Sequence, residues 1–292
     1  MARGTLLNDY SRDGFVIREV LTPDEVAGYL EVMETLLSTS ARPRQTGVHD
    51  AAYQHLGDEL GEFGRESRQY YFHLLTRPGT EPIHSAFHHP AVLALAEELL
   101  GPRLIVNNAS ILAFNPGVTY GLGWHRDVIQ IPEDEIDDRL FSPRRHHNSV
   151  QINLPLLDEA CLWVVPGSHN RPNRPEEEAV FAGSKHYSPV GAEMPGAVPV
   201  RLRPGEAVFY NNNLIHCGRA DDASAARRTL HMGYHSATRP PTWHFYLLDA
   251  DRLTPAYLDR LDPTMRRMMD EYLACRAEYP EMSATWQPDY VT

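Results

Sequence analysis

The pattern of apolar and polar positions changes about one third of the way along the chain. Before residue 101 the apolar residues recur at helical spacing in two segments, whereas after residue 103 they fall into short runs separated by Pro-Gly and Asp turns. We therefore expect helices first, a set of short strands next, and a final helix at about 254–277.

Local signals place the boundaries of the first elements. The segment 22–25, Thr-Pro-Asp-Glu, has the composition of a helix start, with a capping Thr, a Pro in the first turn and acidic residues behind it. This predicts a helix over 23–37, after a short strand at 14–17. A second helix is predicted over 90–100, where Gly101 ends it.

The region after residue 103 is predicted to be rich in β-structure. The expected strands lie at 104–115, 149–157, 161–165, 198–202, 207–210 and 227–234. Helices followed by seven or eight short strands favour a β-barrel or jelly roll with helices packed outside it. The fold class is therefore mainly β with flanking helices. We expect one domain, with helical N-terminal support at about 20–101, a barrel core at about 103–235 and a C-terminal helix at 254–277.

Composition narrows the possible functions. A hydrophobic content of 42% suffices for a buried core, and the net charge of −12 disfavours nucleic acid or an anionic membrane as a partner. The sequence contains no membrane-length apolar run and no visible secretory signal. Cys161, Cys217 and Cys275 are too far apart for a zinc clip, and free thiols fit a reducing cytoplasm. Nothing in the sequence indicates an oligomeric state.

Two histidines and an aspartate have the spacing of metal ligands. His125 and Asp127 are two residues apart, so on an extended strand their side chains point to the same face. His216 follows an apolar run that a neighbouring strand could bring opposite them. Two histidines and one carboxylate on one side of a metal form the facial triad of non-haem iron(II) oxygenases, which leaves positions open for a bidentate co-substrate and dioxygen.

An arginine pair follows at the start of a predicted strand. Arg227 and Arg228 face opposite sides of that strand, so only one can point into the barrel. A buried arginine can bind a carboxylate through two hydrogen bonds, which is what the far end of a dicarboxylic keto acid requires.

The order of these motifs resembles the phytanoyl-CoA dioxygenase family. The resemblance runs from about 15 to 234 and rests on the His-x-Asp pair, on Cys-Leu-Trp-Val-Val-Pro-Gly-Ser-His at 161–169, and on a Gly-Glu-Ala-Val-Phe strand that leads to His216 and then Arg227. It implies a double-stranded β-helix that uses iron(II), 2-oxoglutarate and dioxygen.

The resemblance also implies roles for individual residues. His125, Asp127 and His216 are expected to bind iron, and Arg227 to bind the distal carboxylate of 2-oxoglutarate. Gln151 stands where some members carry an aromatic residue, and we expect it beside the co-substrate. Asn108 is a second polar residue that we expect beside the co-substrate. The alternative is a core amide whose hydrogen bonds are satisfied within the protein.

The expected reaction is oxidation of a small organic molecule with release of succinate and CO2. Halogenating relatives carry a small residue at the Asp127 position, so hydroxylation or a related oxidation is favoured. The same scaffold serves many substrates, and a secondary metabolite or a modified amino acid is our expectation. Two alternatives stay open, namely a cupin-like enzyme that needs no co-substrate and a barrel that only binds a ligand.

Substrate contacts are expected from two segments, 128–148 and 170–195. The second is polar, contains Glu176–Glu178 and has little to bury, so we expect a structureless loop that closes over the metal as a lid. A solvated loop without a role is the alternative. Arg126, Arg144 and Arg145 are candidates for contacting an anionic substrate, although arginines at the protein surface are the commoner explanation.

Overall fold

A computed structural model describes residues 3–39, 68–71, 74–76, 79–117, 120–127, 148–184, 187–220, 224–239 and 253–280. Its helices are α1 (Arg3–Asp13), α2 (Pro23–Thr39), α4 (Pro90–Leu100), α6 (Pro175–Phe181), α7 (Pro255–Leu258) and α8 (Pro263–Glu278), with 3-10 turns η1 (Leu74–Thr76), η2 (Glu81–His88) and η3 (Ser168–Asn170). Its strands are β1 (Phe15–Glu19), β2 (Arg68–Tyr71), β3 (Leu104–Phe114), β4 (Tyr120–Gly121), β5 (Ser149–Pro155), β6 (Glu159–Val164), β7 (Val198–Leu202), β8 (Glu206–Tyr210), β9 (His216–Ala220) and β10 (Arg227–Ser236).

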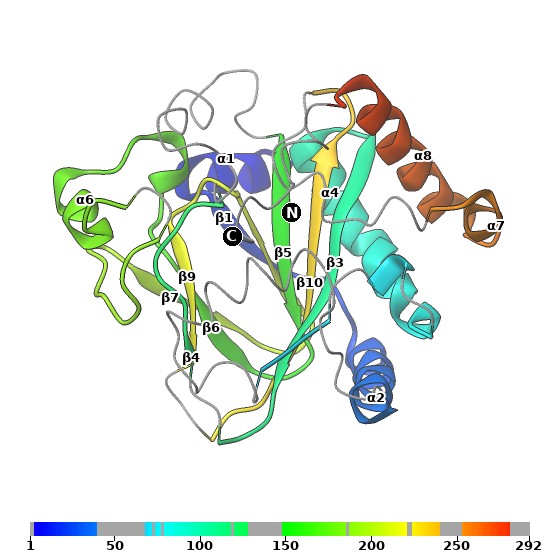
Figure 1. Cartoon of the computed structure of the whole chain (residues 1–292), viewed down its shortest axis with the longest axis horizontal. Helices are drawn as coiled ribbons and strands as arrows, with labels where there is room; N and C mark the ends of the chain where they lie inside the picture. Colours follow the sequence, from blue (N-terminus) through cyan, green and yellow to red (C-terminus); the bar gives the residue numbers. More distant parts are fainter. Residues whose placement is uncertain are drawn as a thin grey trace, which may run out of the picture.

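The strands form two antiparallel sheets, the arrangement of a double-stranded β-helix whose barrel is not closed. The larger sheet has the order β1-β8-β5-β10-β3-β2, and the smaller sheet has the order β4-β9-β6-β7. Figure 1 shows the larger sheet in the centre, with α4 and α8 on one side and the smaller sheet on the other. Leu162 and Val164 of the smaller sheet pack against Val208 and Tyr210 of the larger one, so this cluster lies between the sheets.

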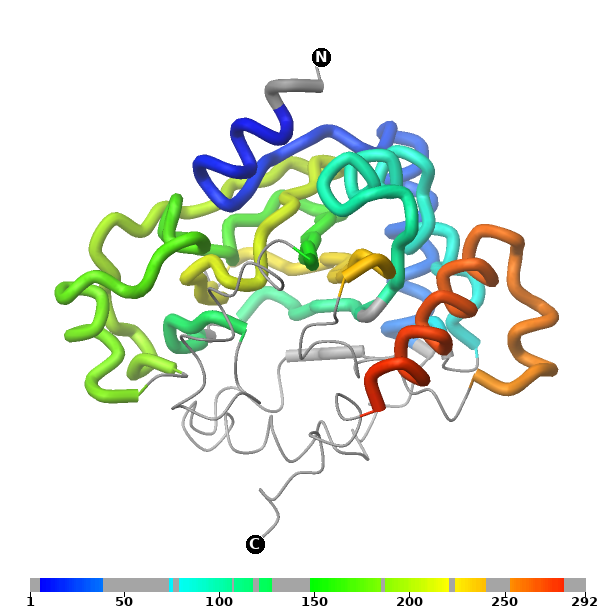
Figure 2. The backbone as a smooth tube through the Cα atoms, turned by 90° about the horizontal axis from the view of Figure 1, so that it is seen from above, coloured from blue at the N-terminus to red at the C-terminus, as the bar shows by residue number. Residues whose placement is uncertain are grey.

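Side chains alternate sharply across the larger sheet. Ile152 and Leu154 of β5 and Leu230 and Met232 of β10 belong to the main hydrophobic core, which α4 and α8 cover. Figure 2, seen from above, shows these two helices beside the strands. The residues between them face inward, and most are polar. This polar inner face consists of Asn108, Ser110, Gln151, Asn153, Thr229 and His231.

The predicted elements agree with the structure except in two places, and four elements, α1, β2, β4 and β9, were not predicted. The expected helix at 254–277 is divided into α7 and α8, because Asp262 caps a new helix whose first residue is Pro263. The expected structureless loop at 170–195 contains α6, so that prediction was wrong. Among the described residues, no helix is long and apolar enough to cross a membrane.

The N-terminal strand supports the loops that carry the candidate ligands. Gly14 precedes β1 with a φ of +80°, and a Cβ built there would lie 2.5 Å from His169 Nδ1 and 2.7 Å from Leu214 Cδ1. Its carbonyl also accepts a hydrogen bond of 2.9 Å from the N–H of Asn211. The chain therefore needs a glycine here both for its backbone conformation and for close packing.

Replacing Gly14 should weaken the fold. Gly14→Ala is expected to lower the free energy of unfolding by about 2 kcal/mol or more, because the new methyl group meets the His169 ring in a backbone conformation that L-residues avoid. Gly28→Ala is the matched control. It lies in α2 with nothing within 4 Å of its Cβ position, so it should raise stability by up to about 1 kcal/mol. Urea denaturation of both variants measures this, and a neutral Gly14→Ala would contradict it.

Candidate metal centre

His125 and His216 are held opposite each other by their backbones. The N–H of each donates to the carbonyl of the other, both at 2.9 Å. His216 opens β9, where it also pairs with Val164 of β6, and His125 follows β4. Because residues paired in this way present their side chains on the same face, the two imidazole rings lie with centroids 4.2 Å apart.

Asp127 completes a group of three donor atoms. One nitrogen from each histidine and one oxygen from Asp127 all lie within 4.8 Å of one another. Asp127 Oδ1 is 3.7 Å from His125 Nε2 and 3.8 Å from His216 Nε2. Such a cluster of donors has the composition and the convergence that a divalent metal ion requires.

The two rings are also held in the tautomer that a metal needs. His125 Nδ1 is 2.8 Å from the carbonyl of Gly123, and His216 Nδ1 is 2.8 Å from the carbonyl of Leu214. A carbonyl can only accept, so both Nδ1 atoms carry the proton. The lone pair of each ring is then on Nε2, the atom directed toward Asp127.

Gln151 orients the carboxylate of Asp127. Its side-chain N–H donates to Asp127 Oδ2, while the hydroxyl of Tyr210 donates to Gln151 Oε1 at 3.4 Å. Asp127 Oδ1 is thereby turned toward the histidines. Asn108 lies in the same row of the larger sheet, two strands from Gln151, and accepts a hydrogen bond of 2.6 Å from Ser110.

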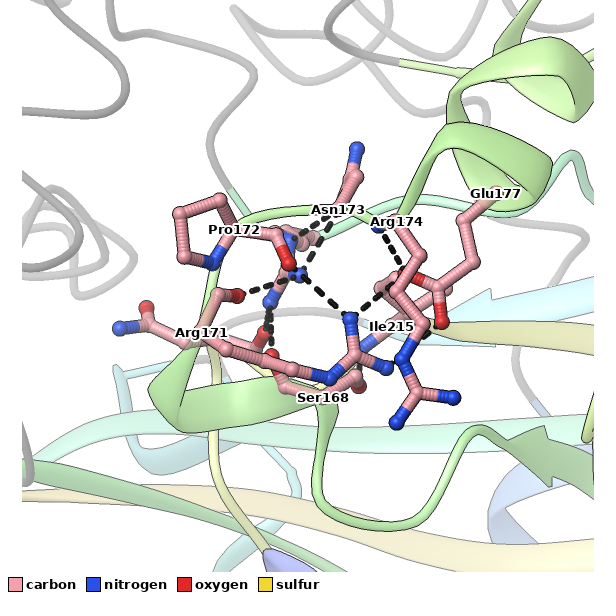
Figure 3. A network of polar contacts seen from close by, with 9 residues as sticks. Ser168, Arg171, Pro172, Asn173, Arg174, Glu177 and Ile215 are labelled. Carbon is pink, nitrogen blue, oxygen red and sulfur yellow. Dashed lines mark hydrogen bonds and ion pairs between the residues drawn. The ribbon is translucent and has the colours of Figure 1, made fainter.

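Arg126 lies between His125 and Asp127 in the sequence. Its side chain is buried and points away from the ligands. Its guanidinium donates to the carbonyls of Ser168 at 2.7 Å, of Arg171 at 3.1 Å and of Asn213, and to Asn173 Oδ1 at 2.8 Å. Figure 3 shows the part of this network formed by Ser168, Arg171 and Asn173. The side chain of Arg126 is therefore held inside the protein by backbone carbonyls of two segments, which argues against both a surface position and a substrate contact.

The segment after η3 is packed against this network. Glu177 of α6 has a side chain only 1% exposed and binds Arg171 through two hydrogen bonds of 2.6 and 2.7 Å, drawn in Figure 3. Burial raises the pKa of Glu177, but the hydrogen bonds from Arg171 and from the N–H of Arg174 lower it further, so the pKa lies below its usual value. Of the three acids Glu176–Glu178, only Glu177 is buried and paired, whereas the other two are exposed.

The far end of the same segment reaches the metal ligands. Tyr187 forms a backbone bridge with His125, and the two rings lie 4.6 Å apart. Residues 128–147, which include Arg144, Arg145 and most of the other segment expected to contact substrate, lie outside the described residues.

The two arginines at the start of β10 face opposite ways. Arg228 lies on the outer face, where it binds Glu34 of α2 at 2.7 Å and the carbonyl of Phe114 at 2.8 Å. Arg227 lies on the inner face and binds the carboxylate of Glu159 through Nε at 3.2 Å and Nη2 at 2.8 Å. The inward residue is the one that the sequence favoured, but a carboxylate of the chain already binds it.

Comparison with known proteins defines the class. The sequence profile of the phytanoyl-CoA dioxygenase (PhyH) family matches residues 10–229, so the chain belongs to that family. Its enzyme class is that of the iron- and 2-oxoglutarate-dependent oxygenases. No protein of curated function shows significant sequence similarity.

The chain is also similar to solved structures from nogalamycin biosynthesis. The non-haem alpha ketoglutarate dependent epimerase SnoN is 25% identical over 80% of this chain and 83% of that chain, with a TM-score of 0.57. SnoN in complex with Fe3+, alpha ketoglutarate and nogalamycin RO is 23% identical over 81% and 84%, with a TM-score of 0.58. The carbocyclase SnoK is 22% identical over 81% and 85%, with a TM-score of 0.55.

Sequence reasoning missed three residues of this region. Glu159 was not considered as a site residue, and Tyr187 lies in a segment expected to be structureless. Arg126 was expected near the substrate or at the surface, whereas it is buried. A buried arginine next to a ligand carries no sequence signal of its own, because its partners are backbone carbonyls. Of the three, only the segment that contains Tyr187 had a usable signal. Pro175 followed by acidic residues is typical of a helix start, so the segment could have been predicted to contain a helix.

Arg126 is expected to stabilise both the fold and the metal centre. Arg126→Met leaves buried carbonyls without a donor beside His216, so the free energy of unfolding should fall by about 2–4 kcal/mol. Metal affinity should fall about tenfold or more, as when other groups that orient ligands are removed. Urea denaturation and metal titration measure the two effects.

Arg103→Met is the control for Arg126→Met. Arg103 also forms a two-bond ion pair, with Glu271, but its side chain is 58% exposed. Its loss should cost less than about 1 kcal/mol. Similar losses in the two variants would contradict the assigned role of Arg126.

Proposed function

We propose that the chain is an iron(II)- and 2-oxoglutarate-dependent oxygenase in which His125, Asp127 and His216 hold the iron. The observation that carries the proposal is the convergence of the two Nε2 atoms on Asp127 Oδ1, with both Nδ1 protons committed to carbonyls. When bound, the iron would supply the chemistry that uses dioxygen.

The residues of the chain have separate tasks in this proposal. The backbone pair fixes the two imidazoles, and Gln151 fixes the carboxylate, so the ligand group is arranged before the metal arrives. Arg227, on the inner face of β10, binds the distal carboxylate of 2-oxoglutarate. Tyr187, stacked near His125, shields one side of the site from water.

The polar inner face supports a small polar substrate. Its amide, hydroxyl and imidazole groups are buried or half-buried and bind one another or neighbouring side chains, so a ligand that separates them must offer polar partners in return. A long acyl chain offers none, so we propose oxidation, with hydroxylation favoured, of a small polar organic molecule. A secondary metabolite or a modified amino acid has this character.

One observation favours the alternative of an enzyme that needs no co-substrate. Arg227 is paired with Glu159 in the protein itself, so its charge has a partner before any 2-oxoglutarate binds. The two functions differ in a measurable way, because only the first requires a 2-oxo acid and releases succinate.

Removal of either histidine should abolish metal binding. The purified protein is expected to bind one iron(II) per chain under anaerobic conditions, whereas His125→Ala and His216→Ala leave a pair of ligands that chelates poorly. His88→Ala is the control, since His88 pairs with Asp262 at the surface of η2. Undiminished binding by the His125 and His216 variants would rule out this centre.

The two arginines of β10 should differ in their effect on 2-oxoglutarate. In the iron-loaded protein without oxygen, Arg227→Met should weaken 2-oxoglutarate binding by about 2–4 kcal/mol, because a charge-assisted pair is lost. Arg228→Met should leave binding unchanged, since Arg228 contacts α2 on the outer face. Calorimetric titration of each variant with 2-oxoglutarate measures the difference, and retained iron binding shows that the site of the variant is intact. An equal effect of both substitutions would mean that Arg227 does not bind the co-substrate.

A further inference from the structure

The carboxylate of Glu159 is bound by donors of the inner face of β10. Arg227 donates through Nε and Nη2, and the hydroxyl of Thr229 donates to Glu159 Oε2. The side chains of Arg227 and Glu159 are 6% and 3% exposed. A buried carboxylate with two bonds from an arginine and one from a hydroxyl is bound in the way that a carboxylate ligand would be.

An irregularity in β6 directs Glu159 inward. Leu162 and Val164 face the space between the sheets, so strict alternation would turn Glu159 outward. The register with β7 shifts between Glu159 and Leu162, where three steps along β6 match two along β7, and Glu159 comes to pair with the inward Leu202. Such bulges redirect a side chain, and this one places a carboxylate between the sheets.

Glu159 is placed where its side chain can leave. It is the first residue of β6 and directly follows Asp158, which is exposed. Rotation of the side chain of Glu159 toward that turn would carry the carboxylate to solvent without a change in the strand pairing that holds His216, which lies at the other end of β6, opposite Val164.

Charge balance argues against Glu159 and a dicarboxylate binding together. The charges of iron(II), Asp127, Arg227 and a dianionic 2-oxo acid cancel, whereas Glu159 adds one negative charge in a buried site, which is costly. Two carboxylates also cannot both take the Nε–Nη2 edge of one guanidinium.

We propose that Glu159 is an internal competitor for the carboxylate-binding position of Arg227 and Thr229, and that a dicarboxylate co-substrate binds by displacing it. This proposal rests on the proposed function, in which 2-oxoglutarate uses Arg227. Glu159 then balances the charge of Arg227 in the resting protein and lowers its affinity for the co-substrate.

The test is anaerobic calorimetric titration of the iron-loaded protein with 2-oxoglutarate and with pyruvate, which lacks the distal carboxylate. Glu159→Gln should bind 2-oxoglutarate about tenfold tighter or more, with pyruvate binding unchanged. Glu177→Gln is the matched control, because Glu177 is an equally buried partner of Arg171 on another element. It should leave both affinities unchanged.

The outcomes separate this proposal from the proposed function. If Glu159→Gln binds 2-oxoglutarate equally or more weakly, or if pyruvate binding tightens in parallel, the displacement is wrong although the co-substrate assignment stands. If wild type and both variants bind iron but not 2-oxoglutarate, the co-substrate assignment fails and the displacement with it.

A second variant gives a readout that does not depend on iron. Glu159→Ala removes the internal carboxylate, so glutarate should raise its unfolding temperature more than that of the wild type. Equal shifts in the two proteins would overturn the proposal.

Discussion

The two hydrogen bonds exchanged by the backbones of His125 and His216 are the constraint on which the metal centre depends. They extend the pairing of β4 with β9 as far as His125, which lies beyond the end of β4, and His216, the first residue of β9, and they fix the two rings on one face. A further hydrogen bond, from the N–H of Asp127 to the carbonyl of Asn212 at 3.1 Å, holds the third ligand to the same loop. Backbone pairing therefore brings together ligands that are far apart in the sequence, and side-chain contacts only set the orientation of each ligand.

The charges of two buried arginines, Arg126 and Arg227, are compensated differently. Arg126 has its charge solvated by carbonyl oxygens of two segments, 168–171 and 213, which makes it a fixed structural cross-link. Arg227 is compensated by the carboxylate of a side chain on another sheet. A guanidinium held by several backbone groups can be released only by local unfolding, whereas one held by a side chain needs only a change of rotamer. The first arrangement suits a scaffold and the second suits a binding position.

The sequence predicted the elements that carry strong local signals. Pro23 and Pro90 begin helices as expected, and the alternation along β5 and β10 placed Arg227 and Arg228 on opposite faces. It did not predict β9, because His-Cys-Gly-Arg-Ala has little intrinsic strand preference and is extended through its pairing with β4 and β6. Nor could it predict the inward direction of Glu159, since a bulge shifts the face of a side chain without leaving a mark in the composition.

The polar inner face limits what the space between the sheets can accept. Several of its groups already bind one another, such as His231 with Asn153 at 2.7 Å and Ser110 with Asn108 at 2.6 Å. These pairs satisfy the buried donors and acceptors when no ligand is present. A ligand that separates such a pair must offer matching polar groups, or it leaves a buried group without a partner at a cost of about 1–3 kcal/mol. The preference for small polar molecules that we propose therefore rests on the strand alternation itself, before any loop at the mouth of the barrel contributes to specificity.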